Sequence, residues 1–234
     1  MSQFFSLTDT LTVKDLQVYL GRAGRVEDGS IRMIAGSGVL AVYTAILYPR
    51  SLLDHIPTVL GLRTFATTRE AAFDAVVPTR SLLNRLVQAA NAAQPDENVD
   101  GEGESEPLSI RLPLEVSTVT WTGITPPRGG WRRVGETSGA VLFDTAAEGI
   151  ADVAEAIPAQ AGEQIVQRVR GEVWGRPIPS LEYVAAGAAF AAHSLGFLVD
   201  RDERVGVYET GPWTRLTLRR GHVLVKRPAW SLRG

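Results

Sequence analysis

Residues 213–227, WTRLTLRRGHVLVKR, alternate apolar and polar side chains and contain a glycine near the middle. This alternation is typical of two strands that each bury one face, and the glycine between them indicates a β-hairpin. A second hairpin is predicted at residues 30–47, where two apolar, β-branched runs join at Gly36-Ser37-Gly38. The chain is therefore expected to contain mainly antiparallel strands.

Helical patterns accompany these strands. Val13, Leu16 and Leu20 recur at helical spacing after Thr12, the expected N-cap of a first helix. Further helices are predicted after a strand that ends at Pro78, before Pro158, at residues 162–175 and at residues 183–197, and further strands at residues 58–67, 108–124 and 204–210. The expected fold class is α+β: an N-terminal helix plus mainly antiparallel strands, then a C-terminal helical cluster that ends in a β-hairpin.

An acidic segment divides the chain. Residues 96–106, DENVDGEGESE, hold six acidic and no basic side chains and a single apolar residue, Val99. Such a composition cannot bury enough apolar surface to order itself, so it predicts a disordered linker or a long loop. The expected domains are residues 1–94 and residues 108–234, both α+β, with residues 95–107 as the acidic linker between them.

Composition limits the compartment and the chemistry. The chain has no cysteine, which excludes disulfides, thiolate metal sites and a cysteine nucleophile and is typical of a reducing cytoplasm. The N-terminus lacks the pattern of a signal peptide, and the longest weakly polar run, residues 184–199, is shorter than the ~20 residues that span a bilayer. We therefore expect a cytoplasmic protein with no membrane partner.

The cationic face of the C-terminal hairpin allows two interpretations. With the turn centred on Arg220-Gly221, an apolar face would form, and Arg215 would lie opposite Lys226, although a three-residue loop would shift this register. One interpretation is a half-buried edge hairpin whose charges deter strand pairing. The other is an anion-binding surface made by Arg215, Arg219, Arg220, Lys226 and Arg227.

A second candidate site combines a loop with a helix end. The loop TPPRGGWRR, residues 125–133, and the segment around Trp174 concentrate charged and aromatic side chains, namely Arg128, Trp131, Arg132, Glu172, Trp174 and Arg176. Glu172 and Arg176 are four residues apart and are expected to pair. No phosphate-binding motif is present. The three histidines lack the spacing of metal ligands; they are His55, His193 and His222. No catalytic residue, metal or cofactor is therefore predicted.

Two stretches resemble a family of conserved two-domain proteins of unknown function from high-GC Gram-positive bacteria. They are LTVKDLQVYLGRAGRVEDGSIRMIAGSGVLAVYTAILYPRSLLD and QRVRGEVWGRPIPSLEYVAAGAAFAA with YETGPWTRLTLRRGHVLVKR. The resemblance implies a boundary near ESEPLSIRLPLE and supplies no activity or catalytic residue. The order of patterns in the N-terminal half, with DAVVPTRSLLNRL and LSIRLPLE, is also similar to one domain of a bacterial DNA sliding clamp.

Three functions remain open. The leading hypothesis is a non-enzymatic, cytoplasmic binding or regulatory protein whose basic C-terminal hairpin engages an acidic partner, either the nucleic-acid backbone or an acidic protein, with residues 96–106 as an internal competitor. The alternatives are a small-molecule enzyme with a site near Trp174, Arg176 and residues 126–133, and a homo-oligomeric structural protein with its Ala/Gly-rich helix at the interface.

Overall fold

The computed structural model describes residues 4–51, 54–92, 107–117, 119–158 and 160–228. The chain forms two compact units, which are Met1–Thr44 with Arg63–Val119 (unit 1) and Ala45–Leu62 with Thr120–Gly234 (unit 2). The chain passes from one unit to the other at three points, and the sequence-based domain boundary at residues 95–107 stays a prediction. The expected disordered linker, residues 96–106, lies outside the described residues.

Unit 1 contains the predicted N-terminal hairpin. Its strands β2 (Ser30–Gly36) and β3 (Val39–Leu47) are antiparallel, and β5 (Phe73–Pro78) pairs with the other edge of β2. Ser37 and Gly38 form the two-residue turn with φ angles of 54° and 81°. A tight hairpin turn of this kind needs positive φ at both central residues, so the Gly-Ser-Gly signal is confirmed.

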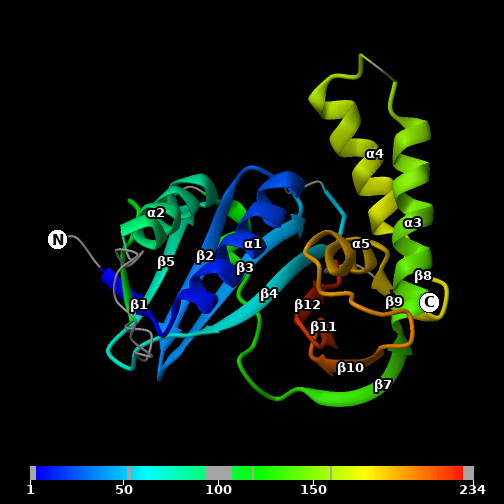
Figure 1. The fold of residues 1–234 in the computed structure, drawn as a ribbon. Coiled ribbons are helices and arrows are strands. Elements are labelled where there is room, and N and C mark those ends of the chain that lie inside the picture. The colour runs from blue at the N-terminus through cyan, green and yellow to red at the C-terminus, as the bar shows by residue number, and fades with distance from the viewer. Residues whose placement is uncertain (1–3, 52–53, 93–106, 118, 159, 229–234) are drawn as a thin grey trace. The chain divides into compact units, whose positions relative to one another are not determined.

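Two helices cover one face of these strands in Figure 1, namely α1 (Thr10–Val26) and α2 (Thr79–Ala92). The hydroxyl of Tyr19, which is fully buried on α1, lies 2.7 Å from the hydroxyl of Thr44 on β3. The predicted N-cap of α1 is wrong: Asp9 caps the helix and accepts a hydrogen bond from the amide of Thr12 at 2.7 Å. A carboxylate one turn earlier satisfies the free amides at this helix start.

A short two-stranded ribbon completes the described part of unit 1. Its strands are β1 (Phe4–Leu7) and β6 (Leu108–Arg111), which pair in antiparallel register with Phe4 opposite Arg111. The prediction of β structure throughout residues 108–124 is wrong in extent. Among the described residues from 112 to 124, the regular structure is one 3₁₀ turn, Thr120–Gly123, which buries Trp121.

Unit 2 contains an antiparallel sheet. Its strand order is β4 (Thr58–Ala66, of which Thr58–Leu62 lie in unit 2), β12 (Gly221–Lys226), β11 (Trp213–Leu218), β10 (Arg204–Thr210) and β7 (Arg132–Ser138). The C-terminal hairpin, β11 and β12, therefore lies inside the sheet, because β10 pairs with β11 and β4 pairs with β12. The interpretation of an edge hairpin is wrong, since both strands have partners on both sides.

The register of this hairpin differs from the predicted one by two residues. Leu218 pairs with Gly221 and Arg215 with Leu224, so Arg219-Arg220 form the turn and Arg215 does not face Lys226. A shift of two residues leaves the apolar side chains on the same face. Distant residues explain the register: the amide of Arg219 donates to Glu203 Oε1 at 2.6 Å, and a Cβ at Gly221 would lie 2.6 Å from the ring of Phe197.

Three helices belong to unit 2, namely α3 (Gly139–Ala156), α4 (Glu163–Gly175) and α5 (Gly187–Ser194). Each contacts the other two, and α5 also packs against β12. The helix predicted at residues 183–197 begins late, because Leu181–Ala185 form β9 and pair with β8 (Pro177–Ile178). With five helices and mostly antiparallel strands among the described residues, the α+β class is confirmed.

Candidate nucleic-acid interface

The five hairpin cations lie at three separate places. Arg219 and Arg220 form the exposed turn, Arg215 lies in the middle of β11, and Lys226 and Arg227 lie at the opposite end of the hairpin. Arg227 already has partners within the fold: its Nη2 donates to the carbonyl of Gly211 at 2.8 Å, and its guanidinium lies 5.6 Å from the ring centroid of Tyr183. The hairpin therefore presents dispersed charges rather than one cationic cluster.

Arg215 contacts two aromatic rings. Its guanidinium carbon lies 4.7 Å from the ring centroid of Trp131, just before β7, and 4.7 Å from that of Tyr208 on β10. Its Nε is buried and has no hydrogen-bond partner within the described residues. Burial lowers the pKa of Arg215, and the phenol of Tyr208 partly opposes this shift. The rings stabilise a cation that is partly removed from water.

Arg215 also acts on a neighbouring histidine. His222 lies on β12, and its Nδ1 is 3.2 Å from the hydroxyl of Thr217 on β11. Burial lowers the pKa of His222, and the positive charge of Arg215 lowers it further. A positive charge and desolvation both disfavour the protonated imidazole. His222 is thus held toward its neutral form in the folded protein.

The structure does not join Trp131 to the other half of the second candidate site. Trp174 is 2% exposed, and its ring stacks on Phe190 with the centroids 4.4 Å apart. Trp131 instead contacts Arg215, and its indole N–H donates to the carbonyl of Pro127 at 3.1 Å. Arg128 and Arg132 flank it as exposed side chains. Trp174 therefore behaves as a core residue of the α3–α5 cluster.

The predicted pair of Glu172 and Arg176 is wrong. Glu172 accepts from Arg168, one turn earlier on α4, at 3.0 Å, while Arg176 donates to Asp152 on α3 at 2.5 Å. Arg176 follows the last residue of α4 and has an extended backbone, with φ −61° and ψ 145°. Its side chain therefore leaves the helical spacing on which the predicted pair depended.

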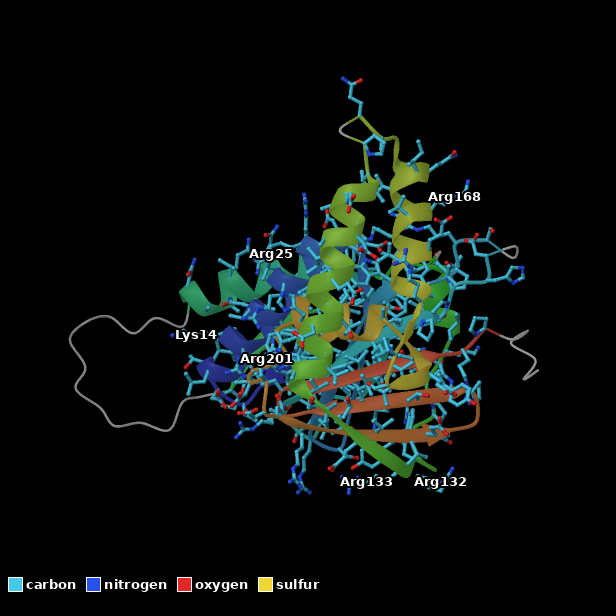
Figure 2. The ribbon with its side chains drawn as sticks, turned by 90° about the vertical axis from the view of Figure 1, so that its right-hand side faces the viewer. Lys14, Arg25, Arg132, Arg133, Arg168 and Arg201 are labelled. Atoms are coloured by element: carbon cyan, nitrogen blue, oxygen red, sulfur yellow. The ribbon has the colours of Figure 1, made fainter. Side chains whose placement is uncertain are left out.

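Sequence reasoning missed a basic surface on α1. Lys14, Arg22 and Arg25 recur at i, i+8 and i+11, which places them on one face of a helix, and Figure 2 shows Lys14 and Arg25 near its two ends. Eleven residues of α-helix separate these two ends by about 16 Å. We call these three residues the α1 stripe. The signal was the spacing of the charges, which the larger C-terminal excess of arginine obscured.

The other charges of α1 and α2 strengthen this surface. The two helices contain five cationic side chains and one acidic one, Asp15, which pairs with Arg63 on β4. The cations are Lys14, Arg22, Arg25, Arg80 and Arg85. Arg80 is the exposed partner of Asp28 at 2.8 Å. Within their own bounds, α1 and α2 therefore carry a net positive charge, while Asp9, Glu27 and Asp28 lie just beyond the ends of α1.

Helix α3 of unit 2 has the opposite charge. It contains four acidic side chains and no basic one; the acidic residues are Asp144, Glu148, Asp152 and Glu155. Two of them form ion pairs, Asp144 with Arg201 at 2.8 Å and Asp152 with Arg176. A phosphate backbone would be attracted by α1 and repelled by α3.

The described residues give no sign of a metal centre or a membrane span. No group of three or more His, Asp or Glu side chains among them is placed to hold a metal ion. None of the helices in the described ranges is long and apolar enough to cross a bilayer.

This fold, with helices over antiparallel strands in both units, is similar to that of bacterial DNA sliding clamps. A putative DNA polymerase III beta subunit from Eubacterium rectale superposes with a TM-score of 0.51 at 8% identity, over 99% of this chain and 67% of the other. The pol III beta of Caulobacter crescentus superposes with a TM-score of 0.50 at 11% identity, over 99% of this chain and 66% of the other. The likeness concerns the fold, and the chain spans about two thirds of the length of the clamps.

Two domain families of unknown function match separate parts of the chain. Residues 1–102 match the domain of unknown function DUF8010, and residues 126–230 match the domain of unknown function DUF8185. No curated protein gives a significant match. The resemblance to a two-domain family of unknown function with a clamp-like pattern is therefore confirmed.

Proposed function

We propose that this protein is a non-enzymatic binding protein of clamp-like fold whose acidic partner is the DNA backbone, and that the α1 stripe makes the contact. The single observation that carries the proposal is the charge of the helical layer in unit 1. Five cationic side chains against one acidic side chain, itself paired with Arg63, leave an excess of positive charge on α1 and α2. Lys and Arg side chains on one helix face supply the sequence-independent part of DNA binding.

The asymmetry between the units supports the choice of surface. Helix α3 has only acidic charges, and α4 carries two arginines against two glutamates, so neither of these helices of unit 2 has the positive excess of α1 and α2. The hairpin supplies a rival surface, since Arg219 and Arg220 are exposed at its turn. The hairpin cations are dispersed, whereas Lys14, Arg22 and Arg25 follow one line, and we therefore assign the contact to the α1 stripe.

The test is a titration of a fluorescently labelled DNA duplex of generic sequence with the full-length chain, followed by anisotropy at low and moderate salt. The variant carries Lys14→Gln and Arg25→Gln. Because each phosphate contact contributes about 0.9 to the slope of log affinity against log salt, the variant is expected to lower the magnitude of that slope by about two. Its affinity at low salt is expected to fall about tenfold.

The matched control removes the same charge from the rival surface, with Arg219→Gln and Arg220→Gln. It is expected to bind the duplex as the unmodified protein does. If the hairpin variant loses binding and the α1 variant retains it, the C-terminal hairpin is the contact and the α1 assignment is wrong. If the unmodified protein does not bind at low salt, where phosphate contacts are strongest, DNA is not the partner.

The Ala/Gly-rich helix α5 does not support the alternative of a homo-oligomeric structural protein. Four alanines of α5 are 0% exposed, namely Ala188, Ala189, Ala191 and Ala192. This helix packs inside unit 2 against α3, α4 and β12. It therefore offers no free apolar face to a second copy of the chain.

A further inference from the structure

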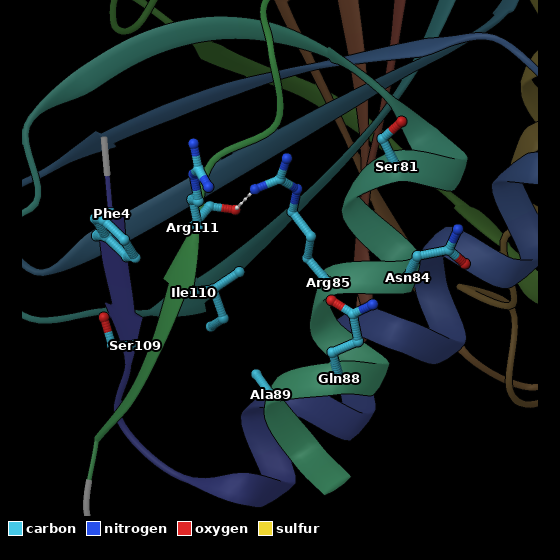
Figure 3. Close-up of a pocket in the computed structure, with 9 residues that line it drawn as sticks. All are labelled: Phe4, Ser81, Asn84, Arg85, Gln88, Ala89, Ser109, Ile110 and Arg111. Carbon is cyan, nitrogen blue, oxygen red and sulfur yellow. Dashed lines mark hydrogen bonds between the residues drawn. The ribbon is translucent and has the colours of Figure 1, made fainter. Parts of the chain in front are cut away.

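A groove in unit 1 lies between α2 and the β1–β6 ribbon (Figure 3). Its volume is about 650 Å³, within the range of small-molecule sites, and we call it the α2–β6 groove. Nine residues line it, and none of them is acidic: Phe4, Ser81, Asn84, Arg85, Gln88, Ala89, Ser109, Ile110 and Arg111. The α1 stripe does not line this groove, and Arg85 is the residue that the groove shares with the five cations of α1 and α2.

The groove wall on α2 is a polar stripe. Ser81, Asn84, Arg85 and Gln88 recur at i, i+3, i+4 and i+7, so they share one helix face. The neighbouring face, with Leu82 and Leu86 fully buried, faces the core of unit 1. One hydroxyl, two amides and one guanidinium are thereby aligned along the same side of the groove, as Figure 3 shows.

Two arginines meet at one end of the groove. Arg85 Nη1 donates to the main-chain carbonyl of Arg111 at 3.3 Å, which holds the Arg85 guanidinium beside the end of β6 (Figure 3). Neither side chain has a carboxylate partner among the described residues. Two neighbouring positive charges repel each other, and an anion between them would remove that repulsion while accepting several hydrogen bonds.

An aromatic ring lies beside this pair. Phe4 is 56% exposed, and it is the direct cross-strand neighbour of Arg111 on the ribbon. Side chains directly opposite on an antiparallel pair have Cβ atoms about 5 Å apart. An exposed ring next to a guanidinium pair suits a ligand that joins a planar ring system to an anion.

We propose that the α2–β6 groove binds a nucleotide, with its phosphate at Arg85 and Arg111 and its base against Phe4. The amides of Asn84 and Gln88 and the hydroxyl of Ser81 then contact the polar edges of the ligand. Stacking on an aromatic ring and charge-assisted bonds to phosphate are the two interactions that proteins use for single nucleotides. The nucleotide is either free or part of a single strand, because both present the same base and phosphate.

The experiment titrates the full-length chain with AMP, with inorganic phosphate and with a labelled oligothymidine strand, using calorimetry and anisotropy at low salt. The groove variants are Arg111→Gln, Arg85→Gln and Phe4→Ser, and the control is Arg69→Gln, an exposed arginine of unit 1 outside the groove. Each arginine variant is expected to weaken AMP binding about tenfold, since each removes charge-assisted bonds. Phe4→Ser is expected to weaken the binding of AMP and to leave the binding of inorganic phosphate unchanged. Arg69→Gln is expected to change neither affinity.

The outcomes separate the sources of the ligand and the two proposals. If AMP binds as tightly as the oligothymidine strand, the ligand of the groove is a free nucleotide. If the strand binds far more tightly than AMP, the ligand is single-stranded nucleic acid. Three outcomes would each overturn the proposal. The first is equal affinity for AMP and inorganic phosphate, and the second is a polyaspartate peptide that displaces AMP at a concentration lower than that of AMP. The third is unchanged AMP binding by a folded Arg111→Gln variant. Lys14→Gln with Arg25→Gln is expected to leave AMP binding intact, so failure of the duplex contact and failure of the groove are distinguishable.

Discussion

The guanidinium carbon of Arg215 lies 4.7 Å from the centroid of the Trp131 ring. This contact joins β11 to the segment before β7, two parts of unit 2 that are distant in sequence. A partly desolvated contact between arginine and tryptophan stabilises a fold by about 0.5–2 kcal/mol. A double-mutant cycle with Trp131→Ala and Arg215→Ala, measured by urea unfolding, is expected to give a coupling free energy in that range. The same cycle with Arg220→Ala, at the exposed turn, is expected to be additive.

The stability of the protein is expected to fall on acidification because of His222. Burial and the charge of Arg215 hold its folded-state pKa below 6.5, so the unfolded state binds more protons as the pH falls through 6.5. The stabilisation from the neutral imidazole is fully present above 6.5 and is lost as the pH falls toward the folded-state pKa. Urea midpoints measured across this range are expected to fall less steeply in His222→Gln than in the unmodified protein.

Gly149 and Trp174 test whether the tryptophan belongs to the core. A Cβ at Gly149 would lie 2.2 Å from the ring of Trp174, so Gly149→Ala is expected to lower the free energy of unfolding by about 1–3 kcal/mol. The control is Gly24→Ala on α1, where an added Cβ meets nothing within 4 Å and removes a helix-weakening glycine. This control is expected to stabilise the protein. Equal effects of the two substitutions would contradict the tight packing around Trp174.

The sequence predicted those helices and strands whose ends are determined by neighbouring residues in the chain. The β2–β3 hairpin was predictable because Ser37 and Gly38 supply the turn, and the β5–α2 junction because Pro78 ends the strand. The register of β11 and β12 was not predictable, since Glu203 and Phe197 hold the turn and lie elsewhere in the chain. Residues 183–185, which were predicted as helix, belong to β9, because pairing with the nearby strand β8 competes with helical propensity.

The candidate surfaces show a similar division. The spacing of Lys14, Arg22 and Arg25 was readable along α1, but a count of basic residues directed attention to the C-terminus. The α2–β6 groove was not readable, because it depends on β6 lying beside α2 and on the pairing of Phe4 with Arg111. Sequence spacing therefore located charged faces of single helices, whereas a site built from distant strands required the fold.

Removing the charge of residues 96–106 is expected to strengthen DNA binding. These residues carry six carboxylates and no cation, and in the competitor hypothesis they compete with a phosphate backbone for basic side chains. A variant with Asn and Gln at the six acidic positions is therefore expected to bind a DNA duplex severalfold more tightly at low salt. The gain is expected to disappear at moderate salt, because screening weakens the competition. An unchanged affinity at low salt would remove the competitor hypothesis.

The acidic face of α3 is expected to weaken DNA binding as well. Glu148 and Glu155 are exposed on this helix. The variant Glu148→Gln with Glu155→Gln is expected to raise duplex affinity at low salt by less than the change in residues 96–106, since only two charges are removed. The circular dichroism spectrum serves as the control for helix content. A loss of affinity in this variant would show that α3 itself contributes to the contact.

Strands β3 and β4 each run through the boundary between the two units, and the chain crosses that boundary three times. A fragment that ends at residue 102 keeps β4 but loses β12, the strand that pairs with Thr58–Leu62, and so uncovers Leu60, which is 1% exposed in the whole chain. No single cut of the chain therefore releases either unit intact. The protein is expected to melt in one cooperative transition, and any shortened version must keep both halves to remain folded.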